Sequence, residues 1–327
     1  MPGKSRREFL QASAAAAAFT AAPGLALADD AWPTRPVRLI VGFTPGTATD
    51  ITARVFSSGA SDTLGQQLIV ENRPGAGSAL AANYVARSAK DGYTLFVVTT
   101  SAVTGLAMKP DPGFDLTRDF APVSLLASGA VVLVASTQSG LKSVADVIAL
   151  AKQKPNEVLC ANVGVGSLPH FAAVLFAQRA GIKLAHVPYP GSPQAVNDLL
   201  AGRVAIFFSP ASTVVGHIAA GKVTALATAA GQRAKAFPDV PSIAEAGMKD
   251  FDTSLWFGLL APLGTPRAAI DKVAAAAGKA MRAPAAVDSM TKQGFETIGN
   301  SPDQFGGYLK SEIKRWADVA RAAGVKT

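Results

Sequence analysis

The sequence predicts an α/β protein with parallel sheets that are covered by helices on both faces. Short apolar runs alternate with segments of helical spacing, and this alternation is typical of parallel sheets. The chain has 327 residues, which favours two domains at roughly 100–200 residues each. An apolar share of 49 % excludes a disordered chain. Ligands bind beyond the carboxyl ends of parallel strands, so the strand-to-helix loops are the expected site.

In the first half of the chain, apolar runs predict strands and amphipathic spacing predicts helices. The strand at 37–43 lies between two prolines, and the helix at 49–64 places Ile51, Val55 and Phe56 on one side. The same two patterns predict strands at 68–71, 93–98 and 131–135, and helices at 78–89 and 144–152.

The second half continues the alternation and ends in helices. The pattern predicts strands at 158–162, 184–187, 204–208, 223–228 and 254–261, and helices at 168–180, 192–200 and 214–219. Trp256 and Phe257 lie within the last of these strands, so we expect them in the core. The final helices, at 266–281, 284–293 and 302–323, each start at a proline, which has no N–H to lose in a first turn.

The first 28 residues predict an export signal that does not belong to the fold. Arg6 and Arg7 precede an uncharged stretch that ends in Ala26-Leu27-Ala28, a pattern typical of a cleavage site. The paired arginines favour twin-arginine export. The Sec route and an uncleaved membrane anchor are the alternatives. We expect residues 1–28 to be removed and the mature chain to be a soluble protein of the periplasm.

The net charge of +8 does not indicate a nucleic-acid partner. The export segment carries a net +2, which leaves +6 on the mature chain, and those basic residues are scattered. A nucleic-acid site would need them clustered with aromatic residues. The single cysteine, Cys160, excludes an intramolecular disulfide and a cysteine-rich zinc site. We expect no nucleic acid, no metal and no cofactor.

The first of three candidate loops, 43–50, follows a predicted buried strand and opens a helix. Gly46 lets the main chain approach a guest, and the first N–H groups of the helix attract a carboxylate or phosphate. Asp50 either binds backbone N–H groups and holds the loop, or faces a cationic group of the ligand. An ordinary capped turn is the alternative interpretation.

The second loop, 72–78, and the third loop, 161–170, also place glycine and a hydroxyl residue before a helix. The glycines of the second loop do not fit a nucleotide-binding fingerprint. Gly77-Ser78 ends the second loop, and Gly166-Ser167 lies in the third. Three such loops on separate strands predict anion-binding sites that converge.

Catalytic interpretations of these residues have little support. Ser167 and His170 would be the nucleophile and base of an exported hydrolase, but Gly166 directly precedes Ser167, so G-x-S-x-G is absent. His186 and His217 lack metal-binding spacing. Capping or packing is the more common role for a histidine one turn into a helix. We therefore expect a binding protein and not an enzyme.

A series of short motifs runs in order along nearly all of the mature chain. They are WPTRPVRLIV (32–41), PGTATD (45–50), VENRPGAG (70–77), KDGYTL (90–95), DFAPV (119–123), VPY (187–189), PDVP (238–241), EAG (245–247) and WFGLLAP (256–262). In this series the chain resembles the extracytoplasmic solute receptors of tripartite tricarboxylate transporters, the Bug receptors.

The resemblance implies a type II periplasmic-binding fold, in which two α/β lobes enclose one carboxylated ligand in a cleft. Lobe 1 would comprise 29–126 and 253–327, and lobe 2 would comprise 127–252. The resemblance also implies a monomer that delivers a small carboxylate to the membrane permease subunits of a tripartite transporter. The ligand-binding residues that it implies are Phe43, Thr44, Gly46, Thr47, Ala48, Asp50, Gly77, Ser78, Thr100, Ser101, Gly164, Gly166, Ser167, His170, Tyr189 and Ser209.

The chain departs from the family pattern inside the expected cleft. Thr47 and Ser78 stand where the family usually has a second glycine, Pro190 replaces a usual lysine and Ala205 replaces a common aspartate. These changes make the cleft less polar, so we hypothesise a ligand with an apolar or aromatic body rather than citrate. A ligand-sensing subunit of a signalling kinase is an alternative role that the sequence does not separate from uptake.

Overall fold

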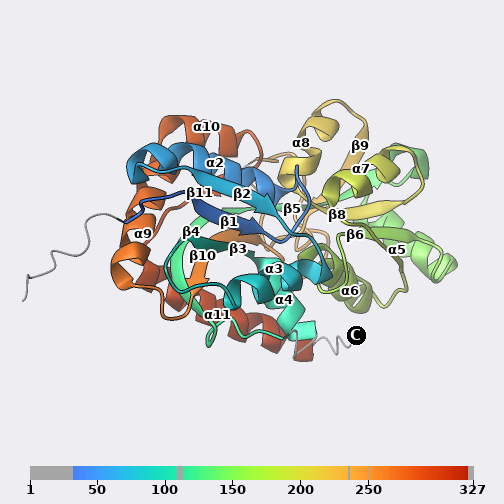
Figure 1. Ribbon diagram of the computed structural model, residues 1–327. Helices are drawn as coiled ribbons and strands as arrows, with labels where there is room; N and C mark the ends of the chain where they lie inside the picture. Colours follow the sequence, from blue (N-terminus) through green and yellow to red (C-terminus); the bar gives the residue numbers. More distant parts are fainter. Residues whose placement is uncertain (1–31, 109–112, 235, 250, 323–327) are drawn as a thin grey trace, which may run out of the picture.

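The computed structural model describes residues 32–108, 113–234, 236–249 and 251–322, so the predicted export signal at 1–28 lies outside the described residues. Two β-sheets with their helices form two lobes (Figure 1). The six-stranded sheet, in the order β11-β4-β10-β3-β1-β2, defines lobe 1. The five-stranded sheet, in the order β7-β6-β8-β5-β9, defines lobe 2. The predicted α/β class is confirmed.

Lobe 1 combines the first strands of the chain with strands from its middle and end. Its strands are β1 (Val37–Val41), β2 (Leu68–Asn72), β3 (Thr94–Thr99), β4 (Phe120–Gly129), β10 (Leu255–Pro262) and β11 (Phe295–Thr297). Its helices are α2 (Ala48–Leu64), α3 (Ala79–Ala86), α4 (Thr100–Met108), α9 (Arg267–Arg282), α10 (Pro284–Thr291) and α11 (Pro302–Ala322), with the short turn η1 (Ala76–Ser78). Because β1 pairs in parallel with β2 and β3, the loops that follow these strands emerge at one edge of the sheet.

Lobe 2 is built from the middle of the chain. Its strands are β5 (Val131–Ser136), β6 (Leu159–Asn162), β7 (Ala185–Pro188), β8 (Ile206–Pro210) and β9 (Val223–Thr228). Its helices are α5 (Val144–Gln153), α6 (Leu168–Ala180), α7 (Ser192–Leu200) and α8 (Ala211–Ala219), with the short turn η2 (Thr137–Ser139). β6 pairs in parallel with β7 and β8, so the loops before α6, α7 and α8 also share one edge.

Both sheets are mixed, so the expectation of parallel sheets is wrong for the strands near the crossings between lobes. β10 runs antiparallel to β3 and β4, and β5 runs antiparallel to β8 and β9. β4 ends at Gly129 and β5 begins at Val131, so the chain passes almost directly from one sheet into the other. It returns between β9 and β10. Neighbouring strands that leave and re-enter a lobe run in opposite directions, and an apolar run does not reveal strand direction.

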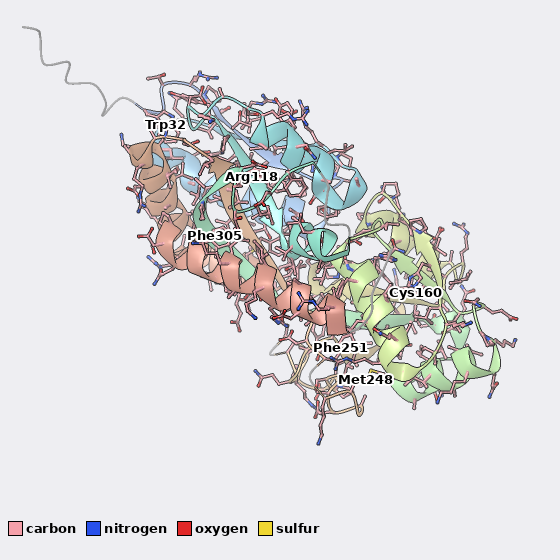
Figure 2. All side chains as sticks on the ribbon, turned by 90° about the horizontal axis from the view of Figure 1, so that it is seen from below. Trp32, Arg118, Cys160, Met248, Phe251 and Phe305 are labelled. Atoms are coloured by element: carbon pink, nitrogen blue, oxygen red, sulfur yellow. The ribbon has the colours of Figure 1, made fainter. Side chains whose placement is uncertain are left out.

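The cores follow the apolar pattern, and β10 buries Trp256 and Phe257 as predicted. α11 lies along lobe 1 and carries Phe305, whereas Cys160 lies in lobe 2 (Figure 2). Glu312 on α11 is only 4 % exposed and accepts hydrogen bonds from the indoles of Trp256 (2.8 Å) and Trp316 (2.9 Å). These bonds satisfy a carboxylate that burial would otherwise destabilise.

α4 is an element that the sequence did not predict. It starts directly after β3 without a turn, and its polar residues Ser101 and Thr104 are buried, which hides the amphipathic spacing that marks a surface helix. No helix among the described residues is both long and apolar enough to span a bilayer.

Candidate functional site

The first loop is a tightly capped start of α2. Gly46 has a φ of 78°, in the left-handed region that glycine tolerates. Thr47 is the N-cap: its Oγ1 accepts from the N–H of Asp50 at 3.4 Å and donates to the carbonyl of Thr44 at 2.9 Å. The cap satisfies one of the N–H groups that a helix start leaves without an acceptor.

The Asp50 side chain, only 3 % exposed, holds this loop in shape. Its carboxylate accepts from the N–H of Gly46 (3.0 Å), from two nitrogens of Arg54 (both 2.9 Å) and from Nδ2 of Asn72 (3.0 Å). Burial raises the pKa of Asp50, but the hydrogen bonds from Arg54, Gly46 and Asn72 outweigh it and keep the pKa below its usual value. Both oxygens are engaged, so we infer that Asp50 positions the loop rather than contacting a ligand.

The first turn of α2 keeps two free donors. The N–H groups of Ala48 and Thr49 have no acceptor among the described residues, although both residues are buried (2 % and 4 % exposed). Buried N–H groups without a partner are rare in folded proteins. The start of a helix also carries a partial positive charge. These two donors can therefore bind a carboxylate.

The second loop brings a strained segment against the first. The φ angles are 143° at Gly75, 48° at Ala76, 62° at Gly77 and 84° at Ser78. Left-handed backbone costs other residues roughly 1–2 kcal/mol, and such strain concentrates at functional sites. Gly42, just after β1, lies so close that a Cβ there would overlap the Ser78 side chain.

Two hydroxyls of these loops are buried and unpaired. The Oγ of Ser78 and the Oγ1 of Thr44 are inaccessible to solvent and have no hydrogen-bond partner among the described residues. Thr44 Oγ1 faces Gly191 of lobe 2, where an added Cβ would collide with it. A buried hydroxyl without a partner costs about 1–3 kcal/mol, and a bound polar ligand would remove that cost.

The third loop repeats the geometry of the first loop. Gly166 has a φ of 83°, and Ser167 is the N-cap of α6. Ser167 Oγ accepts from the N–H of His170 at 3.4 Å and donates to the carbonyl of Gly164 at 2.7 Å. The N–H of Gly166 donates to Nδ1 of His170 at 3.3 Å, as that of Gly46 donates to Asp50. In both loops the side chain four residues after the glycine bonds back to it.

The donors of the third loop are already occupied, which differs from the expectation of three similar anion-binding loops. Gly164 donates its N–H to Oδ1 of Asn162 at 3.0 Å. Leu168 donates its N–H to Oγ of Ser101 at 3.0 Å, and Pro169 has none. The first turn of α6 is therefore satisfied by the protein itself, whereas that of α2 is not.

The geometry of Ser167 and His170 does not form a nucleophile–base pair. The hydroxyl of Ser167 donates to a main-chain carbonyl, and Nδ1 of His170 accepts from a main-chain N–H. Burial lowers the pKa of His170 to about 4, with a further contribution from His186, whose ring meets it edge-on at 5.0 Å. His170 is therefore neutral near pH 7, as an accepting Nδ1 requires.

Other predicted site residues are bonded within their own lobes. Thr100 Oγ1 accepts from the N–H of Trp256 (2.9 Å), and Ser209 Oγ lies 2.7 Å from Thr213 Oγ1. Tyr189 donates its hydroxyl to Asp198 (2.7 Å); burial, followed by Asp198, raises its pKa to about 12. The carbonyl of Phe43 accepts from Asn72 Nδ2 (2.9 Å).

Sequence reasoning missed two further buried hydroxyls without partners, on Ser212 and Thr228. Ser212 lies just after β8 and Thr228 ends β9. The available signal was their place at the ends of predicted strands: Ser212 follows the strand at 204–208, and Thr228 is the last residue of the strand at 223–228. The described residues contain no group of three or more His, Cys, Asp or Glu side chains that could hold a metal ion.

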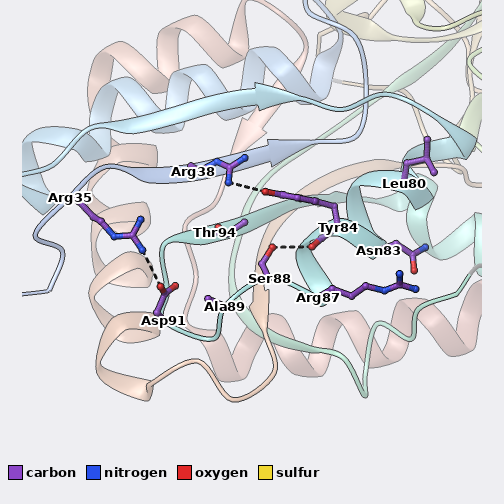
Figure 3. A pocket seen from close by; sticks show the side chains of 10 residues that line it. All are labelled: Arg35, Arg38, Leu80, Asn83, Tyr84, Arg87, Ser88, Ala89, Asp91 and Thr94. Atoms are coloured by element: carbon purple, nitrogen blue, oxygen red, sulfur yellow. Dashed lines mark hydrogen bonds and ion pairs between the residues drawn. The ribbon is translucent and has the colours of Figure 1, made fainter.

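A surface pocket of about 640 Å³ lies on lobe 1 beside the amino ends of β1 and β3 (Figure 3). Arg35 and Arg38 line it, but Arg35 pairs with Asp91 (3.0 Å), and Arg38 bonds to Glu71 and to the hydroxyl of Tyr84 (2.8 Å). Ligands of parallel sheets bind at the carboxyl ends of strands. We therefore place the candidate site at the loops and not at this pocket.

Two α/β lobes joined by two chain crossings, with glycine-rich loops meeting between them, define a two-lobed binding protein of the periplasmic type. The sequence profile described as "Tripartite tricarboxylate transporter family receptor" matches residues 52–325. The chain therefore belongs to the tripartite tricarboxylate transporter receptor family, as its motifs predicted.

Individual relatives agree with this assignment. Protein BugT of Bordetella pertussis is 38 % identical over 312 residues, which cover 94 % of this chain and 96 % of BugT. The structure of R. palustris Rpa4515 with adipate is 33 % identical, with a TM-score of 0.85 over 90 % of this chain and 98 % of that one. MatC of Rhodopseudomonas palustris with bound malate is 32 % identical, with a TM-score of 0.85 over 88 % and 99 %.

Proposed function

We propose that the chain is a periplasmic receptor that captures a small organic carboxylate and delivers it to the membrane subunits of a tripartite transporter. The observation that carries this proposal is the start of α2, where the N–H groups of Ala48 and Thr49 lack acceptors and the hydroxyls of Thr44 and Ser78 lack partners. Adipate and malate, bound by two relatives, are both dicarboxylates.

In the proposed complex, one ligand carboxylate accepts from the free N–H groups of α2, and Thr44 and Ser78 complete its hydrogen bonds. Asp50 does not contact the ligand; it fixes Gly46 so that the helix start stays open. Arg54 is committed to Asp50, so neutral donors rather than a cationic side chain would bind the anion at this loop. This favours a ligand with one buried carboxylate and an apolar body over citrate.

Three further statements complete the proposal. Residues 1–28 form an export signal that is removed, which leaves the mature receptor in the periplasm. Lobe 1 comprises 29–129 and 253–327, and lobe 2 comprises 130–252; the expected boundary at 126 falls three residues too early, because β4 continues to Gly129 in the sheet of lobe 1. The receptor binds without catalysis, because Ser167 and His170 each serve a main-chain group.

The direct test is native mass spectrometry of the protein isolated from its own periplasm, followed by identification of the bound molecule. A thermal-shift screen over mono- and dicarboxylates complements it, because a ligand at a hundredfold excess over Kd stabilises by about 2.7 kcal/mol. We expect a carboxylate with an apolar body to give the largest shift. Citrate as the tightest ligand would overturn the ligand class, and no response to any carboxylate would overturn the receptor assignment.

Two variants locate the site within that screen. Thr44→Val and Ser78→Ala should each weaken carboxylate binding about five-fold, because each removes one hydrogen bond to the ligand. Ser88→Ala is the matched control, since Ser88 Oγ donates to the carbonyl of Tyr84 within α3 and the following turn, away from these loops. Unchanged affinity in both variants would move the site elsewhere.

A further inference from the structure

Two side chains on α4 of lobe 1 hydrogen-bond directly to lobe 2. The Oγ of Ser101 accepts from the N–H of Leu168 at 3.0 Å, and Oγ1 of Thr104 donates to the carbonyl of Gly166 at 3.1 Å. Ser101 is 3 % exposed and Thr104 is 0 % exposed. These bonds join residues more than 60 positions apart in the sequence, and each connects one lobe to the other.

We propose that these two hydrogen bonds, here named the closure latch, hold the lobes together without ligand. Ser101 and Thr104 are thus positioning residues that set the open–closed equilibrium. For Ser101 this role replaces the ligand contact that the family resemblance implied. The inference rests on the proposed function in one respect, since a receptor must open to admit its ligand.

The latch acts on a helix start, where an acceptor is favoured. Leu168 is the first residue of α6, so its N–H has no acceptor within the helix, and the partial positive charge of the helix start attracts the Ser101 oxygen. Ser101 is fixed in turn, because its own N–H donates to Thr99 Oγ1 at 3.1 Å. α6 thereby satisfies with a side chain of lobe 1 what α2 leaves available.

Glycines allow the two main chains to approach closely enough for these bonds. A Cβ on Gly166 would lie 3.3 Å from the Cα of Gly105, and a Cβ on Gly77 would lie 3.1 Å from the carbonyl of Val165. Larger residues would separate the lobes and lengthen both bonds. The adjoining contact is apolar: Phe171 of α6 packs edge-on against Trp316 of α11, with ring centroids 5.2 Å apart.

The hydroxyl of Thr104 also serves its own helix, which determines the controls. It contacts the carbonyl of Ser101 at 3.3 Å as well as that of Gly166. Thr52 on α2 is equally buried and bonds only within its helix, to the carbonyl of Ala48 at 2.9 Å. Thr52→Val therefore loses a within-helix bond alone, whereas Thr104→Val also loses the bond between lobes.

The test uses ligand-free protein, so that it does not depend on the identity of the ligand. Hydrogen exchange of the peptide containing Leu168 and the radius of gyration from small-angle scattering are compared for wild type, Ser101→Ala, Thr104→Val and both together. Each variant should speed exchange about five-fold and the pair more than ten-fold, with a larger radius of gyration. Ser101→Thr, which keeps the hydroxyl, should behave as wild type.

Thr52→Val and Ser124→Ala, both buried and bonded within lobe 1, should leave exchange at Leu168 unchanged. Circular dichroism checks folding, and Ser101→Ala serves alone if Thr104→Val fails to fold. Wild-type exchange and radius in Ser101→Ala would overturn the latch even if carboxylates bind. Opening of the variants without any carboxylate binding would leave the latch standing and overturn the proposed function.

Discussion

The starts of α2 and α6 are two versions of one local structure with opposite outcomes. Each has a left-handed glycine, a hydroxyl N-cap and a side chain that bonds back to the glycine N–H: Asp50 in the first, His170 in the second. The first turn of α2 keeps free donors, whereas the corresponding donor of α6 is taken by Ser101. In our two proposals, the same motif therefore serves ligand capture in one lobe and lobe closure in the other.

The side chains that accept from the two glycine N–H groups, Asp50 and His170, also differ in charge. This difference determines what each loop loses when its side chain is removed. Asp50 is anionic and stabilised by Arg54, whereas His170 is neutral because burial disfavours its cation. Removing Asp50 leaves a cation and two other donors without their acceptor. Removing His170 leaves a single N–H. The comparison can therefore be tested by substitution and by pH.

The largest effect is expected for Asp50→Ala. The change leaves the Gly46 N–H, Arg54 and Asn72 without their shared acceptor. Arg54 is half exposed and can be solvated, so we expect a cost of about 1–3 kcal/mol from the lost hydrogen bonds. Urea unfolding should show this loss, together with loss of carboxylate binding. Asp62→Ala, on an exposed position of the same helix, is the control and should stay within about 0.5 kcal/mol of wild type. An equal effect of both substitutions would contradict the assigned role of Asp50.

The third loop should weaken at a higher pH than the first loop. His170 has its pKa lowered from 6.5 to about 4, so below pH 6.5 the unfolded chain takes up a proton that the folded chain does not bind until about pH 4. The contribution of neutral His170 to the free energy of unfolding is therefore fully present above pH 6.5. It is lost as the pH falls from 6.5 to about 4. The pKa of Asp50 lies below 3.8, so its contribution is lost only under more acidic conditions.

Urea unfolding at pH 7, 5.5 and 4.5 measures this difference. His170→Asn keeps an acceptor for Gly166 but does not titrate, so its stability should fall less between pH 7 and 4.5. Part of the slope should remain, because burial also lowers the pKa of His186. A wild-type slope in His170→Asn would show that His170 does not titrate as described.

Substitution of Gly46 and of Gly166 separates the cost of backbone strain from the cost of steric crowding between the lobes. Gly46→Ala meets only the Pro193 side chain at an ordinary 3.5 Å, so its cost is the left-handed backbone, about 1 kcal/mol. Gly166→Ala adds contact with the Gly105 backbone at 3.3 Å, so it should cost about 1–2 kcal/mol and also open the lobes. Calorimetry of the two variants measures the loss of stability, and small-angle scattering measures the opening of the lobes. A larger scattering radius for Gly46→Ala than for Gly166→Ala would reverse the comparison.

The sequence predicted the loops better than it predicted their roles. Strand–helix alternation located most elements, and glycine with a hydroxyl residue located both helix starts. It did not show that Ser101 fills the start of α6, because that bond joins residues 67 positions apart. α4 was missed for a similar reason, since burial on all sides removes amphipathic spacing. β5, β9 and β10 were located, but their antiparallel direction was not, because strand direction depends on the crossing between lobes. Hydroxyls without partners, such as those of Thr44 and Ser78, are visible only once the packing is known.

The smallest effect is expected at the two N-caps, and it tests whether the starts are equivalent locally. Thr47→Ala and Ser167→Ala each remove a hydroxyl that accepts from the third helical N–H, which costs about 1 kcal/mol. The exchanges Thr47→Ser and Ser167→Thr keep that hydroxyl and should each cost less than about 0.5 kcal/mol by urea unfolding. Ser167 has 0 % exposure, so Ser167→Thr also probes space for one methyl group. Ser167→Thr could cost as much as Ser167→Ala while Thr47→Ser stays near wild type. That result would show that packing at the lobe contact, rather than the cap, distinguishes α6 from α2.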